Sequence, residues 1–317
     1  MRPEVLITRP MPDKVIAEAL TKLSLTIRED TTPMTEAECI DALHRYDAVL
    51  PTLGDRFNTA VFAASHAPQC RLLANFGVGY NHIDVAAAKA AGILVANTPG
   101  AVTDATADIA MTLMLMTARR AGEGERMVRA GAWQGWYPTQ LLGAHVTGKT
   151  VGIIGMGRIG KAIAKRAHFG FDMQIRYFNR SPVAEPDVSS QQVDLAQALA
   201  SDFVVIAVPG GPATHHLIGR EALAQMKPHA FLINIARGDI VDESALIDAL
   251  HNKTIAGAGL DVYEHEPEVA PELIAMENVT LLPHLGTASL EVREAMGLMA
   301  VHNLFAFFDG KPLPNPV

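Results

Sequence analysis

The segment at residues 150–167, TVGIIGMGRIGKAIAKRA, constrains the fold of this chain more than any other. Gly155, Gly157 and Gly160 stand in G-x-G-x-x-G spacing, between a β-branched apolar run and residues that repeat at helical spacing. Ordinary glycine-rich turns also show this spacing, but the flanking strand and helix patterns favour a dinucleotide-binding turn. In such a turn the glycines let the pyrophosphate and the helix approach closely, and helix N–H groups face the phosphates. The loop residues predicted to hold the cofactor are Gly155, Met156, Gly157, Arg158, Ile159 and Gly160.

The end of the next predicted strand, at residues 173–181, indicates which dinucleotide binds. An NAD enzyme usually has a carboxylate here for the ribose 2′-hydroxyl, whereas this chain has Asn179, Arg180 and Ser181. Arg180 can pair with a 2′-phosphate through a charged fork, and Ser181 can donate a further hydrogen bond. We therefore predict that NADP(H) is preferred over NAD(H). The alternative is that Arg180 is only a solvated turn residue.

Composition excludes several classes of protein. The 317 residues suit two domains, and 49% of them are hydrophobic, as in ordinary globular proteins. The 26 Lys and Arg residues against 34 Asp and Glu residues give a net charge of -8 with no basic run, so nucleic acid is not an expected partner. Only two cysteines, Cys39 and Cys70, are present, so neither a disulfide scaffold nor a cysteine-rich metal site is expected. Because no long apolar segment would direct export or enter a membrane, we expect a cytoplasmic protein.

Apolar runs alternate with helix-like stretches along the whole chain, which is typical of α/β folds with parallel sheets. Strands are predicted at residues 4–8, 47–51, 71–76, 92–98, 173–181, 202–209, 230–236, 255–262 and 278–284, in addition to the one before the glycines. Long helices are predicted at 11–23, 106–120 and 289–310. We therefore expect two Rossmann-like, doubly wound parallel-sheet domains.

The helix predicted at 289–310 follows the last strand and is expected to return to the N-terminal domain. One domain is therefore predicted to be inserted into the other. The predicted NAD(P)-binding domain spans 100–286, and the surrounding domain, 1–99 with 287–317, is expected to bind the substrate.

Three residues at the ends of predicted strands could assist the reduction of a 2-oxo acid by a nicotinamide cofactor. Hydride transfer to its carbonyl needs a cation for the carboxylate and oxygen, and an acid for the developing alkoxide. Arg237 follows LINIA, Glu266 lies in DVYEHEP after another strand, and His284 ends NVTLLPH. Ligands bind at the carboxyl edge of open sheets, and a carboxylate beside an imidazole favours the imidazolium. Each residue alone could be a solvated loop residue, but their joint placement at one sheet edge favours catalysis.

Several motifs together resemble those of the D-isomer-specific 2-hydroxyacid dehydrogenases. They are GMGRIG, INIARGDIVDESAL, GLDVYEHEP and LLPHLGTAS, with NFGVGYNHID (75–84) and VANTPGAVTDATADIAMTLML (95–115) earlier in the chain. The likeness covers nearly the whole chain, and within that family it is most similar to the glyoxylate/hydroxypyruvate reductases. The resemblance implies a nucleotide-binding domain inserted into a flavodoxin-like substrate-binding domain.

The resemblance also implies roles for individual residues. Arg237 would bind the substrate's carboxylate and carbonyl, His284 would be the acid/base, and Glu266 would keep His284 protonated. The substrate carboxylate would be held by backbone N–H groups at Val78 and Gly79, with Leu53 lining the pocket. The implied remainder of the cofactor cleft is Thr103, Val208, Pro209, Thr214, Ile235, Ala236, Asp261, His284 and Gly286, with Asp261 on the nicotinamide amide.

A homodimer built through residues 100–150 is a further implication of the resemblance. Trp136 is similar to a residue that reaches the neighbouring subunit's active site, where it would bind substrate and favour short polar acids. The alternative is that Trp133 and Trp136 only fill the dimer interface, as aromatic residues often do.

The chain departs from the family pattern in two places. Asp104 stands where many relatives have glutamate, and PGGPATHHLI at 209–218 replaces a more usual Pro-Leu-Thr segment. Neither change removes a catalytic group, but the second leaves the details of the cofactor-facing loop open.

These observations predict the NADPH-dependent reduction of glyoxylate and hydroxypyruvate to glycolate and D-glycerate. Within the enzyme class, the alternative is a broader 2-oxo acid reductase that acts on 2-ketogluconate or aryl pyruvates. The same fold also serves as a nucleotide-sensing corepressor that binds partner peptides, although the complete Arg, Glu and His set argues against that function.

Overall fold

The computed structural model describes residues 2–184 and 186–317. The chain divides into two compact units, of which unit 1 comprises Met1–Val102 with Ala288–Val317 and unit 2 comprises Thr103–Thr287. The chain leaves and re-enters unit 1 a few residues later than the sequence predicted. Each unit contains one parallel sheet, which confirms the predicted fold class.

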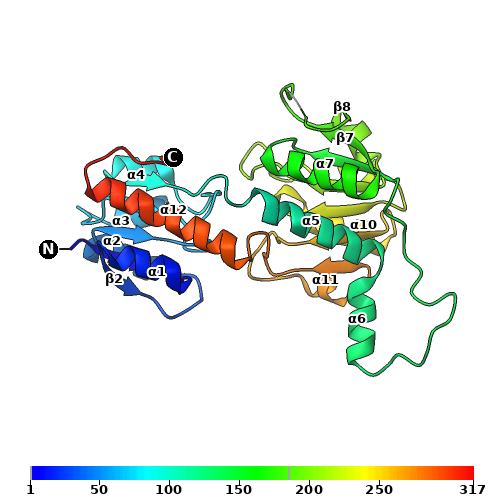
Figure 1. The fold of residues 1–317 in the computed structure, drawn as a ribbon, viewed down its shortest axis with the longest axis horizontal. Helices are drawn as coiled ribbons and strands as arrows, with labels where there is room; N and C mark the ends of the chain where they lie inside the picture. Colours follow the sequence, from blue (N-terminus) through cyan, green and yellow to red (C-terminus); the bar gives the residue numbers. More distant parts are fainter. Residues whose placement is uncertain (1, 185) are drawn as a thin grey trace. The chain divides into compact units, whose positions relative to one another are not determined.

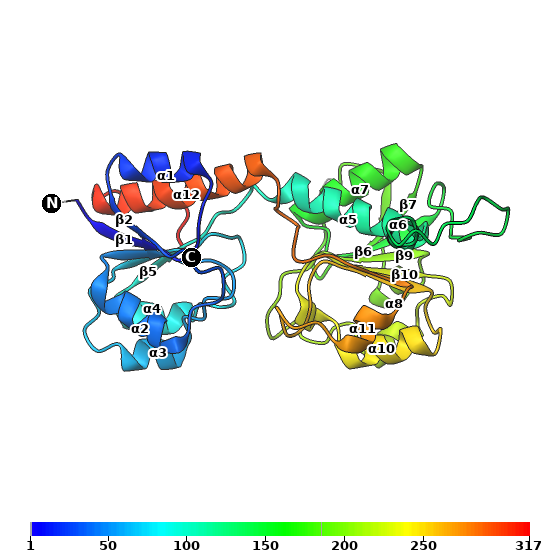
Figure 2. The ribbon, with the colours of Figure 1, turned by 90° about the horizontal axis from the view of Figure 1, so that it is seen from below.

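A five-stranded parallel sheet forms the middle layer of unit 1, in the order β2-β1-β3-β4-β5. Its strands are β1 (Glu4–Ile7), β2 (Ser24–Ile27), β3 (Ala48–Leu50), β4 (Leu72–Ala74) and β5 (Leu94–Ala96). Its helices are α1 (Asp13–Leu20), α2 (Glu36–Arg45), α3 (Thr59–Ala64), α4 (Val85–Ala90) and α12 (Leu290–Phe308). Within this unit, α1 and α12 cover one face of the sheet and α2, α3 and α4 cover the other (Figure 2).

Helix α12 packs against α1 and β4, so the C-terminal segment completes unit 1. The contact with α1 is close because the helix has a glycine there. A Cβ on Gly297 would lie 2.5 Å from Cγ2 of Val15, which is too near for any side chain. Met296, Ala300 and Leu304 are buried on the same helix.

Unit 2 has a seven-stranded parallel sheet in the order β12-β11-β10-β9-β6-β7-β8. The strands are β6 (Thr150–Ile154), β7 (Gln174–Phe178), β8 (Ser190–Gln192), β9 (Phe203–Ile206), β10 (Phe231–Asn234), β11 (Gly257–Leu260) and β12 (Val279–Leu281). The helices are α5 (Thr103–Ala118), α6 (Ala121–Arg129), α7 (Arg158–Phe171), α8 (Leu195–Leu199), α9 (Arg220–Ala224), α10 (Glu243–His251) and α11 (Pro271–Ala275), with one 3₁₀ turn at Gly238–Ile240. In Figures 1 and 2, α5 and α7 lie on one face of this sheet and α10 and α11 on the other.

The central strands of unit 2 are covered on both faces, which explains their continuous apolar sequences. Every residue of β9 (FVVI) and β10 (FLIN) is buried. Helix α5 packs on α7, β10 and β11 and buries Ala107, Leu113 and Met114. These strands are thus fixed in the core, and the residues just after them are positioned by it.

The sequence did not predict the two edge strands β2 and β8. Residues 24–27 and 190–192 carry polar side chains and stay partly exposed, so they lack the apolar signal of the central strands. The helix predicted at 106–120 begins at Thr103 and ends at Ala118. Arg120 has a left-handed backbone (φ +53), which separates α5 from α6.

Both cysteines are buried, and neither forms a disulfide. Burial raises the pKa of each thiol to about 12, and for Cys39 the nearby carboxylate of Asp55 contributes. Neither is therefore a nucleophile at neutral pH. Among residues 2–184 and 186–317, no helix is long and apolar enough to cross a membrane, and no cluster of His, Cys, Asp and Glu could hold a metal.

Candidate active site

The turn between β6 and α7 has the form that a dinucleotide phosphate requires. Gly155 has φ +103, and a Cβ there would lie 2.7 Å from Cγ1 of Val208. A Cβ on Gly160 would lie 2.1 Å from the carbonyl oxygen of Gly155, so this glycine brings α7 against the turn. Gly157 immediately precedes α7, and a Cβ on it would meet open space. The N–H groups of the first helical turn therefore face a space that phosphate oxygens can occupy.

The end of β7 lies beside this glycine turn. Asn179 accepts a hydrogen bond from the backbone N–H of Met156 (3.3 Å) and donates one to the carbonyl of Ser181 (2.8 Å). Gln192 on β8 donates to the carbonyl of Asn179 (3.1 Å). Asn179 thus shapes the turn, and Arg180 and Ser181 are exposed next to it.

Two further segments carry predicted cofactor residues. The Thr214 hydroxyl donates to the carbonyl of Pro209 (2.8 Å), which closes the loop after β9 on itself. Ile235 and Ala236, directly after β10, are 6% and 8% exposed and belong to the core of unit 2. Their backbone therefore supports the site, while their side chains mainly fill the core. The remaining predicted residue, Thr103, begins α5.

Arg237 stands at the carboxyl end of β10. Its turn is held by Asn234, whose side chain accepts from the N–H of Ala236 (3.1 Å) and donates to the carbonyl of Arg237 (2.9 Å). Burial lowers the pKa of the Arg237 guanidinium, and the charges of Glu266 and Asp239 oppose that shift. An arginine keeps its charge under such a shift, so the turn presents a partly desolvated cation.

Glu266 and His284, which the sequence predicted to act together, are in direct contact. Nδ1 of His284 is 2.8 Å from Oε2 of Glu266, and each side chain is about 30% exposed. The other carboxylate oxygen accepts the N–H of Tyr263 (3.0 Å), which fixes its direction. Burial opposes the charge on Glu266, but its hydrogen bond and charge interaction with His284 outweigh burial, and its pKa is lowered. Glu266 is therefore ionised at neutral pH, and its carboxylate faces the imidazole of His284.

Asp261 holds the backbone at His284 and at the two residues after it. Its carbonyl accepts the N–H of His284 (2.9 Å), and its carboxylate accepts those of Leu285 (2.6 Å) and Gly286 (2.8 Å). These bonds hold His284 in a left-handed conformation (φ +55), which non-glycine residues rarely adopt. Burial raises the pKa of Asp261, against the opposing effect of its hydrogen bonds. Thr106 adds a hydrogen bond to the carbonyl of Gly286 (3.1 Å).

The three predicted catalytic residues thus come from one edge of one sheet. Arg237 follows β10, Glu266 follows β11 and His284 follows β12, and these strands are neighbours. The charge of Glu266 acts on both Arg237 and His284. A cation and a supported proton donor at one sheet edge can polarise a carbonyl and protonate its oxygen.

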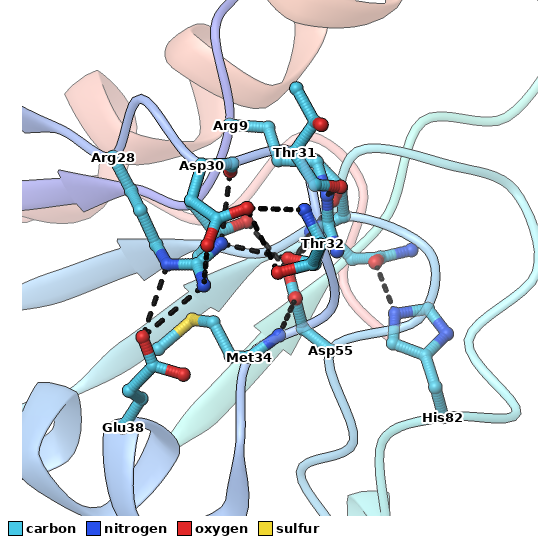
Figure 3. A network of polar contacts seen from close by, with 12 residues as sticks. Arg9, Arg28, Asp30, Thr31, Thr32, Met34, Glu38, Asp55 and His82 are labelled. Carbon is cyan, nitrogen blue, oxygen red and sulfur yellow. Dashed lines mark hydrogen bonds and ion pairs between the residues drawn. The ribbon is translucent and has the colours of Figure 1, made fainter.

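In unit 1, the turn that carries Leu53 is held by a network around Asp55, which Figure 3 shows with Arg9 and Met34. Asp55 is fully buried and pairs with the Arg9 guanidinium (2.8 Å), and it accepts the N–H groups of Met34 (3.0 Å) and Thr52 (3.0 Å). Leu53 itself is 42% exposed. It lines a cavity of about 340 Å³ within unit 1, and Arg9, Phe76 and Arg293 are among the other lining residues. The network therefore presents Leu53 at a preformed cavity.

The loop with Val78 and Gly79 is also fixed by side-chain amides. Asn75 donates to the carbonyls of Gly77 and Gly79, both at 3.0 Å, and its oxygen contacts His82 at 2.9 Å (Figure 3). Asn97 donates to the carbonyl of Val78 (2.9 Å). With these carbonyls engaged, the loop has a defined backbone that could offer its N–H groups to an anion.

The segment after α5 extends from the body of unit 2 (Figure 1). Helix α6 has no buried residue, and the chain that follows it to β6 is mostly irregular. Its exposed apolar side chains are Val128 (60%), Trp133 (53%), Trp136 (79%), Tyr137 (54%) and Leu142 (66%). We call residues 121–145 the arm.

The sequence interpretation missed the residues that hold the catalytic turns. Asn234 is 1% exposed, and Asp261 accepts the backbone N–H groups of three consecutive residues from His284 to Gly286, yet neither residue was assigned this role. The signal was a polar residue directly at the end of a buried strand, as in INIARG and GLDV. Buried polar groups need partners, so such residues commonly organise the adjacent turn.

Comparison with known proteins bears on the whole chain. Residues 111–286 match the family model of the "D-isomer specific 2-hydroxyacid dehydrogenase, NAD binding domain". Glyoxylate reductase of Pyrococcus horikoshii is 44% identical over 324 residues, covering 100% of this chain and 96% of that protein. Glyoxylate/hydroxypyruvate reductase B of Erwinia tasmaniensis is 40% identical over 321 residues, covering 100% and 99%.

A solved structure agrees with the sequence matches. The NADPH-dependent glyoxylate/hydroxypyruvate reductase of Sinorhizobium meliloti, in complex with NADP and malonate, superposes with a TM-score of 0.87 at 35% identity. The match covers 100% of this chain and 97% of that one. Since the family model, full-length relatives and the fold all coincide, the chain belongs to the D-isomer specific 2-hydroxyacid dehydrogenases and has their nicotinamide dinucleotide-binding domain.

Proposed function

We propose that this chain reduces glyoxylate and hydroxypyruvate to glycolate and D-glycerate with NADPH. The observation that carries the proposal is the Glu266–His284 contact of 2.8 Å at the sheet edge that also carries Arg237. The names of the full-length relatives support the choice of substrates. The NADP complex of the Sinorhizobium meliloti enzyme supports the choice of cofactor.

In the proposed reaction, a bound NADPH would supply the hydride for C2 of the substrate, and residues of this chain bind and protonate the C2 oxygen. Arg237 binds the carboxylate and the C2 carbonyl, where its charge stabilises the developing alkoxide. His284 donates a proton to that oxygen, and Glu266 keeps the imidazole protonated and oriented. Asp261 positions His284 through the adjacent backbone, and its remaining lone pairs would accept from the nicotinamide amide.

The preference for NADPH over NADH is assigned to the turn after β7. Arg180 is exposed beside the glycine turn and would pair with the 2′-phosphate, and Ser181 would add a hydrogen bond. Asn179 holds this turn against Met156, so the position of Arg180 relative to the phosphate site is set by a hydrogen bond.

Unit 1 is assigned to substrate binding and unit 2 to cofactor binding. The backbone N–H groups of Val78 and Gly79 would hold the substrate carboxylate, and Leu53 would limit the space at C3. The loop carbonyls are already engaged by Asn75 and Asn97, which supports an anion-binding role for the N–H groups.

A homodimer through the arm completes the proposal. The exposed tryptophans and aliphatic side chains of the arm are more apolar than a monomer surface usually is over a contiguous stretch. We assign Trp136, the most exposed of them, to the partner's substrate site, where it would favour small polar acids.

The test is a steady-state panel that follows NADPH oxidation at about 340 nm. Glyoxylate, hydroxypyruvate, 2-ketogluconate and phenylpyruvate are each measured with NADPH and with NADH. We expect the highest kcat/KM for the two small acids with NADPH, and a loss of about 10²–10⁴-fold in kcat for His284→Ala. Faster turnover of 2-ketogluconate or phenylpyruvate would favour the broader reductase. Tight NADPH binding without any turnover would favour the sensor function.

The cofactor assignment is tested with Arg180→Ala in the same panel. The variant should lose most of the preference for NADPH because it lacks the partner of the 2′-phosphate. The matched control is Arg220→Ala, which removes an exposed arginine from α9, where it pairs with Asp248. Equal or better kcat/KM with NADH in the unaltered protein would contradict the proposed preference.

A further inference from the structure

His216 connects the loop after β9 with both catalytic turns. Its backbone N–H donates to the carbonyl of Asp239 (2.9 Å), two residues after Arg237. Its Nε2 lies 2.7 Å from the carboxylate of Glu264, two residues before Glu266. The backbone of His216 is left-handed (φ +50), so the loop adopts a rarely populated conformation to make both contacts.

The two turns that His216 joins are packed directly on each other. A Cβ on Gly238 would lie 1.9 Å from the carbonyl carbon of Tyr263, so only glycine allows this approach. Glu264 and Glu243 each accept the backbone N–H of the other, at 3.2 Å. A shift of the turn before Glu266 would therefore displace the turn after Arg237.

The side chain of His216 contacts Glu264. The Glu264 side chain is only 16% exposed. Burial opposes its charge, but the hydrogen bonds from His216 and the N–H of Glu243 outweigh burial and lower its pKa. Loss of the His216 contact would leave a largely buried carboxylate with one partner fewer, which favours movement of the turn toward water.

We infer that His216 is a positioning residue for the acid–base pair, acting through Glu264 on the Tyr263–Glu266 turn. This inference rests on the proposed function. The turn matters because the N–H of Tyr263 directs one oxygen of Glu266 (3.0 Å) while the other meets His284. His216 also belongs to the segment 209–218, whose departure from the family pattern the sequence singled out. It thereby couples the proposed cofactor-facing loop to the proton donor.

The charged surroundings of the two histidines define what a pH measurement reports. The carboxylates that face His216 are those of Glu264 and Asp242, and the ring of His215 lies 4.0 Å away between centroids. The side chain of His265 also acts on Glu264.

His284 has a different set of neighbours. It is faced by Glu266 and by the buried Asp261, and Arg237 acts on Glu266. The two histidines therefore have no carboxylate in common, and a change at His216 reaches His284 through the turn.

The experiment compares His216→Ala with His216→Gln, which keeps an N–H donor near Glu264 without a charge. For His216→Ala we expect kcat for hydroxypyruvate with NADPH to fall about ten- to hundredfold, because small misplacements of catalytic groups have effects of this size. The alkaline limb of kcat/KM should move to lower pH by about half a unit or more, since Glu266 then supports the imidazolium less well. His216→Gln should recover most of both effects.

The matched control is His229→Ala. His229 makes the same kind of contact, 3.1 Å from the carboxylate of Asp202, but at the amino ends of β9 and β10, away from the catalytic edge. This variant should leave the alkaline limb in place. Glu264→Ala, which removes the acceptor of this contact, should lose at least as much activity as His216→Ala, and the double variant should lose no more than the worse single one because both act through one contact.

A readout without turnover keeps the inference separate from the proposed function. The ring signals of His284 are followed by NMR against pH in the substrate-free protein, and His216→Ala should move their midpoint to lower pH. An unmoved midpoint would overturn the inference even if activity fell, because a structural defect lowers the amount of active protein without changing the titration. A moved midpoint in a protein that reduces neither glyoxylate nor hydroxypyruvate would support the inference and reject the proposed function.

Discussion

At the scale of single residues, the charge of Glu266 determines how the acid–base pair responds to pH. Burial disfavours this charge, but the interactions with His284, Tyr263 and Arg237 hold the pKa of the carboxylate below its usual value. A lowered folded-state pKa contributes stability that is present above the ordinary glutamate value and is lost as the pH falls through the lowered one. Across the neutral range Glu266 is therefore ionised and supports the imidazolium.

We predict that Glu266→Gln makes the rate of reduction fall at a lower pH than in the unaltered protein. Reduction needs the protonated form of His284, and an amide stabilises that form less than a carboxylate does. The fall of kcat/KM with rising pH should begin at lower pH, and turnover at mildly alkaline pH should drop by about 10²-fold. The measurement is the pH profile for glyoxylate, with the exposed neighbour Glu268→Gln as control. A limb that stays in place in Glu266→Gln would show that the carboxylate does not support the proton donor.

At the scale of elements, the contact between β6 and α7 is set by glycine. A Cβ on Gly160 would lie 2.1 Å from the carbonyl oxygen of Gly155, which is backbone and cannot turn aside. The first turn of α7 would have to move away from the strand that aligns it. The cofactor's phosphates are proposed to lie at the N-terminus of α7, so packing and binding depend on the same contact.

We predict that Gly160→Ala lowers both the melting temperature and the affinity for NADPH. Overpacking of this kind costs about 1–3 kcal/mol. The matched control is Gly170→Ala, at an exposed position near the end of the same helix where a Cβ meets nothing within 4 Å. That variant should be slightly more stable, because alanine favours a helix interior by roughly 1 kcal/mol over glycine. Thermal melts and NADPH titrations of the two variants give the answer. Equal melting temperatures for both would contradict the packing argument.

The elements that the sequence predicted well are those whose burial is complete. β9 and β10 read as strands because both faces are covered, and the residues after such strands could be placed at one edge. The polar edge strand β8, SQQ, carried no such signal. For the turns after these strands, the sequence predicted the positions along the chain but not the backbone conformations. The left-handed backbone of His284 and its support by Asp261 depend on contacts between distant residues, which sequence spacing does not encode.

At the scale of the whole molecule, the exposed apolar side chains of the arm predict that the protein associates with a second copy of itself. We expect the protein to sediment at about twice its mass of 33.9 kDa. Replacing Trp133 and Leu142 by aspartate should give monomers, because charges at an apolar interface are left without partners. Phe169→Asp is the control, since Phe169 is as exposed (68%) but lies on α7 outside the arm. Monomeric unaltered protein at micromolar concentration would contradict the proposed dimer.

The same dimer allows the role of Trp136 to be separated from mere packing. Trp136→Ala should remain dimeric and should raise the ratio of phenylpyruvate to glyoxylate turnover, if the indole limits the partner's pocket. An unchanged ratio would reduce Trp136 to a filler of the interface.

The return of α12 to unit 1 has a consequence for the order in which the protein can be built. Unit 2 is one continuous stretch and can fold as soon as it leaves the ribosome, whereas unit 1 lacks α12 until all of unit 2 has been translated. At typical rates of synthesis, roughly 10–40 s pass between Val102 and Ala288. Throughout that time, the surfaces of β4 and α1 that α12 later covers stay open to water. Unit 1 begins to be translated before unit 2 but is completed after it. A chaperone would bind unit 1 at the surface that α12 has not yet covered.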